Sequence, residues 1–370
     1  MTTLLKRIQL LQALTLIRPA LAPQPYIPAL THVRMSTAPA CVTAYNDILS
    51  ISVSTDSPWN LCLPGDLFIK ALSSLTSDTV KVQVSEDEQS VVLTSGRAKL
   101  KLPALPVSDF HFTAPSLRKS ESVPLSADLL LGLSRCLLNV GNDPTHPEQM
   151  GVTLDRMEDG TGVLYSTDNF TLSRYVTTEL EQPAGMEWGA IILPTLFCQQ
   201  LVNLNKAFPD QDVALFVLPG MLLAKIGESA TVSTKTLVTH EPLEFAAKLE
   251  KHGKVKRLKS RVVPIPTAWE GAFERAMLVL STDLEKVTKV DINSEALRLH
   301  STSPMGDSDD AMEVSDGWHP EGAPSESFYL DPSLVLRTSK VCTHMAFTET
   351  AIVLTDQNCK FVHVIAYCSK

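Results

Sequence analysis

Three apolar stretches decide the fold: TLLKRIQLLQAL (3–14), SADLLLGLSRCLL (126–138) and TAWEGAFERAMLVL (267–280). Each carries its apolar residues at helical spacing, and each is followed by a β region and a second apolar helix. The second helices are LPGDLFIKALSSL (63–75), LPTLFCQQLVNL (193–204) and LDPSLVLRTSKV (330–341), and strand pairs follow at 79–95, 212–227 and 344–356. The same elements in the same order, three times over, predict a threefold internal repeat.

The local chemistry of these segments favours an α+β fold. Strand segments alternate apolar and polar residues, as in TVKVQV (79–84), which predicts antiparallel sheets with one solvated face. Thr267 and Glu270 have the spacing of a capping box. Ser126 and Asp331 are suitable N-cap residues for the helices that follow them.

The repeat divides the chain into three expected domains, at residues 1–117, 118–248 and 249–370. Polar connectors at 113–122 and 248–261 lie near these boundaries. Ser303 to Glu326 holds seven acidic residues and no Lys or Arg, which predicts a solvated loop within the third domain. Docking of a partner is the alternative interpretation of that acidic stretch.

Composition and charge exclude several classes of protein. The 370 residues are 44% hydrophobic and 20% charged, as in a folded globular chain, and the net charge of −9 excludes a polybasic tail. The protein could therefore bind nucleic acid only through a local basic patch or through the geometry of its fold. The seven Cys form no C-x-x-C pair, which gives no support to a zinc site and predicts a reducing, cytoplasmic location.

The N-terminus allows two interpretations. Lys6 and Arg7 precede an apolar run that ends in Ala-Leu-Ala, as in a secretory signal. Gln9, Gln12 and Thr15 interrupt that run, which favours an amphipathic helix of the first domain. No stretch of the chain reaches the roughly 18 consecutive apolar residues that a membrane span requires.

The six repeated helices carry more basic than acidic residues, although the chain as a whole is acidic. This distribution predicts a surface that meets a polyanion, and ordinary solvated helix faces are the alternative. The basic residues are Lys6, Arg7, Lys70, Arg135, Lys206, Arg275, Arg337 and Lys340. No G-x-S-x-G, P-loop, H-E-x-x-H or G-x-G-x-x-G motif is present, so neither an enzyme nor a bound cofactor or metal is predicted.

One longer segment carries a family resemblance. SGRAKLKLPALPVSDF (95–110) resembles the end of the first domain of the bacterial sliding clamp, the β subunit of the replicative DNA polymerase. PYIPAL (25–30), YSTDNFTLSR (165–174) and AFERA (272–276) are similar to further segments of that family, in the same order. This degree of divergence suggests a phage or plasmid origin, or an unusual bacterium.

The resemblance implies a ring. Two chains would close head to tail into a collar of six similar domains, with sheets outside and helices lining a hole for duplex DNA. Such a clamp tethers the replicative polymerase, is loaded by a separate ATP-driven loader, and needs no cofactor and no membrane. A protein-interaction scaffold of three domains that forms no ring is the alternative.

The resemblance also implies site residues. A pocket for partner peptides would include Thr167, Leu172, Pro242, Val364 and Ala366. Asn169-Phe170-Thr171 stands where the family has Gly-His-Arg, so the peptide motif is expected to differ. Gln24 stands where a basic DNA contact is found in one form of the family, and the ring would close through Leu100, Leu102, Leu278 and Val279.

Overall fold

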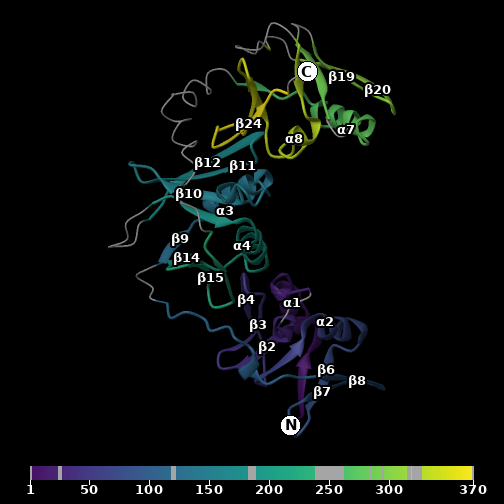
Figure 1. The fold of residues 1–370 in the computed structure, drawn as a ribbon, viewed down its shortest axis with the longest axis vertical. Coiled ribbons are helices and arrows are strands. Elements are labelled where there is room, and N and C mark those ends of the chain that lie inside the picture. Colours follow the sequence, from purple (N-terminus) through teal and green to yellow (C-terminus); the bar gives the residue numbers. More distant parts are fainter. Residues whose placement is uncertain are drawn as a thin grey trace. The chain divides into compact units, whose positions relative to one another are not determined.

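The computed structural model describes residues 2–23, 27–117, 122–181, 189–237, 262–283, 286–292, 296–314, 318 and 327–368. The chain divides into two compact units, which are described separately (Figure 1). Unit 1 comprises Met1–Ser126, Glu181–Met186 and Gln199–Thr236, and unit 2 comprises Ala127–Leu180, Glu187–Cys198 and Leu237–Lys370.

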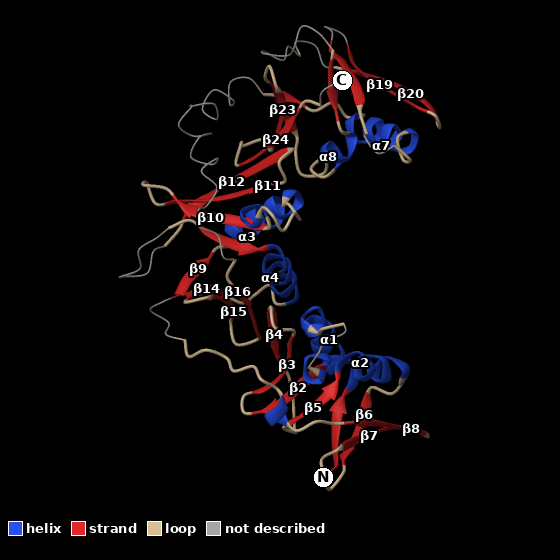
Figure 2. Ribbon diagram, viewed as in Figure 1, coloured by secondary structure: helices blue, strands red, loops and turns tan. Residues whose placement is uncertain are grey.

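Unit 1 contains a four-stranded and an eight-stranded antiparallel sheet with helices α1 (Arg7–Ile17) and α2 (Gly65–Ser74). The smaller sheet has the order β1 (Thr2–Lys6), β6 (Thr79–Val84), β7 (Ser90–Ser95), β8 (Ala98–Pro103). The larger has the order β5 (Leu61–Pro64), β2 (His32–Thr37), β3 (Ala40–Tyr45), β4 (Leu49–Ser54), β16 (Ala230–Lys235), β15 (Met221–Ile226), β14 (Val213–Leu218), β9 (Ser122–Leu125). Helix α1 packs on β3 and β4 and against α2 (Figure 2).

Unit 2 repeats this plan with helices α3 (Ala127–Cys136), α7 (Trp269–Val279) and α8 (Pro332–Leu336). Its eight-stranded sheet has the order β13 (Ile191–Pro194), β10 (Gly151–Arg156), β11 (Thr161–Thr167), β12 (Thr171–Glu179), β24 (Phe361–Ala366), β23 (Ala351–Thr355), β22 (His344–Phe347), β17 (Val263–Pro264). Its four-stranded sheet has the order β20 (Gly306–Glu313), β19 (Ala296–Ser303), β18 (Thr288–Ile292), β21 (Phe328–Leu330). Helix α4 (Thr195–Ala207) begins in unit 2 and ends in unit 1.

The order of elements confirms the predicted threefold repeat. A strand, a helix, three strands, a strand, a helix and three strands occur in turn along β1–β8, β9–β16 and β17–β24. Each eight-stranded sheet joins strands of two successive repeats, through the antiparallel pairs β4–β16 and β12–β24. The compact units therefore cut through the middle repeat, and the predicted boundary at 248/249 lies outside the described residues.

Four of the predicted helices, at 3–14, 63–75, 193–204 and 330–341, begin too early because a short strand precedes each of them. Residues 2–6 form β1, which pairs with β6, and the helix starts only at Arg7. Likewise Leu61–Pro64 is β5, and α2 begins at Gly65. A strand of three to five residues shows too few alternating apolar and polar positions to be distinguished in sequence from the start of the helix that follows it.

The acidic stretch and one cap also differ from expectation. Residues 306–313 form β20 instead of a loop, because they pair along their whole length with β19. The predicted capping box is wrong: Ala268 is the N-cap of α7 and no side chain caps the helix. The Asp331 cap is confirmed, since its carboxylate accepts a hydrogen bond from the Ser333 backbone N–H at 2.7 Å.

Among the described residues, no helix combines the length and the apolar character needed to cross a membrane.

Candidate nucleic-acid surface and partner-binding residues

Three of the four predicted basic residues of unit 1 are exposed and available to a polyanion. Lys6 at the end of β1, Lys70 on α2 and Lys206 on α4 are exposed, and within the described residues no carboxylate pairs with them. Arg7 is held differently, because its Nε donates a hydrogen bond to the backbone oxygen of Ser77 at 2.8 Å. Gln24 lies outside the described residues.

The four predicted basic residues on and beside the helices of unit 2 each lie beside a carboxylate of the protein itself. Arg135 on α3 lies 2.9 Å from Asp356, and both side chains are about one-fifth exposed. The Arg275 guanidinium lies 2.6 Å from Asp310. Two further pairs complete the set, Arg337 with Asp168 and, at a longer 3.8 Å, Lys340 with Glu270.

Arg135 belongs to a cluster that ties α3 to the last two strands of the chain. Its guanidinium lies 5.7 Å from the ring centroids of both Tyr175 and Phe361, a cation–π arrangement. Asp128 on the same helix accepts hydrogen bonds from the Tyr175 hydroxyl at 2.7 Å and from Lys360 Nζ at 3.1 Å. Arg135 therefore has a structural role within unit 2, and the structure does not present it as a free cation.

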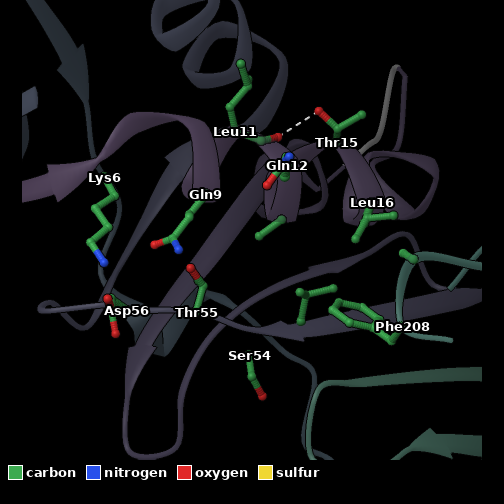
Figure 3. A pocket seen from close by; sticks show the side chains of 13 residues that line it. Lys6, Gln9, Leu11, Gln12, Thr15, Leu16, Ser54, Thr55, Asp56 and Phe208 are labelled. Carbon is green, nitrogen blue, oxygen red and sulfur yellow. Dashed lines mark hydrogen bonds between the residues drawn. The ribbon is translucent and has the colours of Figure 1, made fainter. Parts of the chain in front are cut away.

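A pocket of about 870 Å³ lies beside Lys6 in unit 1, between α1, the end of β4 and the end of α4. Figure 3 shows Lys6 and Asp56 at one end of the pocket and Phe208 at the other. The side chains of Gln9 and Gln12 on α1 add amide groups to its lining. Sequence reasoning missed these two amides, although their spacing of three residues places them on one helix face.

Four of the five residues predicted for a peptide site are brought together in unit 2. Thr167 pairs with Leu172 across the β11–β12 hairpin, and Leu172 pairs with Val364 on β24. The backbone N–H of Ala366 donates a hydrogen bond to the carbonyl of Phe170 at 3.2 Å. Pro242 lies outside the described residues.

The hairpin beside these residues holds an aromatic ring in solvent. Phe170 is 67% exposed, and the preceding Asn169 has a φ of 73°, a turn conformation that Asn tolerates better than most residues. The Asp168 carboxylate fixes the turn by accepting hydrogen bonds from the backbone N–H groups of Phe170 and Thr171. The ring is therefore presented by a constrained backbone.

Alternation along the strands places Leu172 and Val364 on one face of this sheet, together with Arg174 opposite Val362. Val364 packs against a buried cluster formed by Ala346, Val353 and Val362. The next residues along, Ser173 and His363, point to the opposite face. A patch of small aliphatic side chains next to an exposed aromatic is suited to apolar anchors of a partner peptide.

The residues predicted for ring closure lie on or beside the outermost strands of the two four-stranded sheets. On β8, Leu100 is half-buried and Leu102 is buried at 3% exposure, so Leu102 belongs to the core of its own unit. At the end of α7, Leu278 is 74% exposed and Val279 is half-buried. Met305, in the turn that leads into β20, is a further exposed apolar residue at 67%.

These two edge strands carry opposite charge. Lys99 and Lys101 alternate with the leucines on β8 and are exposed. On β20, Asp307, Asp309 and Glu313 alternate with the inward-facing Met312 and are exposed. Within the described part of the chain each strand has a neighbouring strand on one side only, so its other side has a row of backbone groups available for pairing.

The described residues show no arrangement typical of catalysis or metal binding. They contain no group of three or more potential metal-ligating side chains. Burial raises the pKa of the Cys62 and Cys342 thiols to about 12, so these thiols stay protonated at neutral pH.

Comparisons with known proteins agree with this geometry. Residues 1–114 match the family model of the DNA polymerase III beta subunit, N-terminal domain. The beta sliding clamp of Staphylococcus aureus is 23% identical over 266 residues, which cover 70% of this chain and 64% of that protein. The alignment therefore spans less than two thirds of this curated relative.

Solved structures match over the whole chain. The beta subunit of the Streptococcus pyogenes DNA polymerase gives a TM-score of 0.79 at 18% identity, with complete coverage of both chains. A sliding clamp from Bartonella birtlesii bound to griselimycin gives 0.82 at 17% identity, again with complete coverage. The chain has the sliding-clamp fold.

Proposed function

We propose that this chain, a divergent member of the DNA polymerase III beta sliding-clamp family, is a processivity clamp that performs no chemistry of its own. Two copies close head to tail into a ring of six similar domains, with helices facing duplex DNA in the central hole. The ring retains DNA by topology, so its phosphate contacts are weak and independent of sequence. An overall charge of −9 is compatible with such binding.

The observation that carries this proposal is the pair of complementary sheet edges. The basic strand β8 ends one four-stranded sheet and the acidic strand β20 ends the other. A β8 edge of one copy can add to the β20 edge of a second copy by backbone hydrogen bonds, with lysines opposite aspartates. Exposed Leu278 and Met305 lie near the acidic edge and supply apolar contact area.

DNA contact falls mainly to unit 1. Lys6, Lys70 and Lys206 are unpaired among the described residues, whereas Arg135, Arg275 and Arg337 are neutralised by carboxylates. Gln9 and Gln12 supply further donors for phosphate oxygens beside Lys6.

The apolar face at Leu172 and Val364 is the docking site for partner peptides. The replicative DNA polymerase is the expected partner, tethered by a short segment with apolar side chains. An ATP-driven clamp loader opens and closes the ring, since the chain has no P-loop of its own.

The decisive experiment follows the protein on nicked circular DNA. After loading, the clamp stays with the circle during gel filtration and is lost when the circle is cut once. Retention on linear DNA equal to that on circular DNA would contradict topological binding.

Particle mass tests ring formation separately. Light scattering at micromolar concentration should give twice the chain mass of 40.4 kDa. A strict monomer would instead favour the scaffold of three domains that forms no ring.

A further inference from the structure

The eight-stranded sheet of unit 1 has one face lined by hydroxyl groups with a basic residue at each end. In register across five strands lie Arg34, Thr43, Ser52, Thr231 and Lys225. All five line a groove of about 600 Å³. At about 4.8 Å between strands, the two basic residues are separated by roughly 19 Å.

The buried Nε of Arg34 has no hydrogen-bond partner among the described residues. The residue is half-buried, and its Nε is shielded from solvent without a hydrogen-bond partner in the described part of the chain. No described carboxylate forms an ion pair with its guanidinium. A partly buried charge without a partner lowers stability, so this site favours an incoming anion.

Lys225 at the other end is paired only weakly. Its Nζ lies 2.6 Å from Glu228, but that carboxylate is 92% exposed. Ion pairs with so exposed a carboxylate contribute little to stability, because water screens their attraction. A ligand carboxylate can therefore take the place of Glu228.

The corresponding face of unit 2 has a different chemistry. Strands β2, β3, β4, β16 and β15 correspond in the repeat to β10, β11, β12, β24 and β23. In unit 2 the face carries the aliphatic cluster around Val353 and Val364. The row of Thr43, Ser52 and Thr231 therefore distinguishes this groove from the Val353–Val364 cluster of unit 2.

We propose that this groove binds an acidic segment of a partner protein in extended conformation. One carboxylate accepts two hydrogen bonds from the Arg34 guanidinium, and a second, about six residues along at roughly 3.3 Å each, reaches Lys225. The hydroxyls of Thr43, Ser52 and Thr231 face the main chain between the two acids. This inference is independent of DNA binding.

The test uses a fluorescein-labelled, end-blocked peptide with two glutamates separated by five Ser or Gly residues. Anisotropy should show micromolar binding to the full chain at about 0.1 M salt. Arg34→Gln should weaken binding at least tenfold, and the matched change Lys81→Gln, at an exposed lysine of β6, should leave it unchanged. Equal binding to Arg34→Gln, or equal binding of a peptide with Gln in place of Glu, would overturn the proposal.

Two controls sharpen the outcome. Inorganic phosphate at millimolar concentration should not displace the peptide, and full displacement would mean that the site selects a small oxyanion. Arg34→Met should keep or raise the melting temperature, whereas a clear fall would show that Arg34 is satisfied within the fold and would overturn the proposal. Arg34→Gln should still be retained on circular DNA, so a failure here is distinguishable from failure of the clamp function.

Discussion

Arg135 shows why the charge of a side chain does not identify its partner. As a basic residue on a repeated helix, it was predicted to contact nucleic acid, as were Lys70 and Lys206. The structure places it against Asp356, which lies 221 residues further along the chain. Such a pairing depends on how β12 and β24 meet, so no local pattern around Arg135 contains it.

His363 provides a prediction at the residue scale, because it is fully buried and its Nδ1 lies 3.0 Å from the Ser173 hydroxyl. Burial disfavours the charged imidazole and lowers the pKa of His363 from 6.5 to about 3. Below pH 6.5 His363 binds a proton in the unfolded chain but stays neutral in the folded chain. The free energy of unfolding therefore falls as pH falls. The expected loss from this residue is about 2 kcal/mol by pH 5.

Urea unfolding at pH 7.5, 6.5 and 5.0 measures this effect. His363→Gln should lower stability at pH 7.5 and show a shallower decline toward pH 5.0 than the wild type. The exposed His111 serves as the control, and His111→Gln should leave the decline unchanged. If the stability of His363→Gln fell toward pH 5.0 as steeply as that of the wild type, His363 would not be the source of the pH dependence.

At the scale of elements, periodicity predicts most of the fold but not its shortest or most polar strands. The order of helices and strand pairs follows from spacing alone. Strand β20 was not predicted from the sequence, because Asp is rare in strands and four acidic residues among eight are typical of a loop. It is a strand because β19 pairs with it throughout, and the ion pair between Asp310 and Arg275 of α7 secures it.

The complementary edges lead to a prediction about assembly. Lys99→Glu combined with Lys101→Glu places acids opposite the acids of β20 and should weaken dimerisation at least tenfold. Asp307→Lys combined with Asp309→Lys should weaken it similarly, and the four changes together should restore it because opposite charges again face each other. Sedimentation equilibrium measures the dissociation constant of each variant.

The control for this series is Lys81→Glu, an exposed charge change on β6 away from the sheet edge. It should leave the dissociation constant unchanged. Failure of the four-fold variant to recover, with its folding intact by circular dichroism, would show that β8 and β20 do not meet.

At the scale of the whole molecule, the sequence predicts the repeat but not the way its parts share sheets. The threefold order emerges from hydrophobic spacing, because spacing is a local property. The joining of β4 to β16 and of β12 to β24 across repeats is not local, and it creates the face on which Thr167, Leu172 and Val364 lie together. Those residues were predicted from family resemblance, whereas the unpaired Arg34 required the structure.

The last prediction concerns how the proposed ring contacts DNA. Lys6, Lys70 and Lys206 are exposed and unpaired among the described residues, so Lys→Glu at all three should remove the main phosphate contacts of unit 1. Retention on nicked circular DNA should fall several-fold at 0.1 M salt, and its salt dependence should become flatter, because fewer counterions are released on binding. Each lysine is on the surface, so the melting temperature should change little.

The matched control changes Arg337 and Arg275 to Met, which removes two charges that carboxylates already neutralise. This variant should lose some stability but keep the salt dependence of the wild type. If it lost retention while the lysine variant kept it, the DNA-facing surface would lie in unit 2. If both variants were retained on circular DNA like the wild type, topology alone would account for retention.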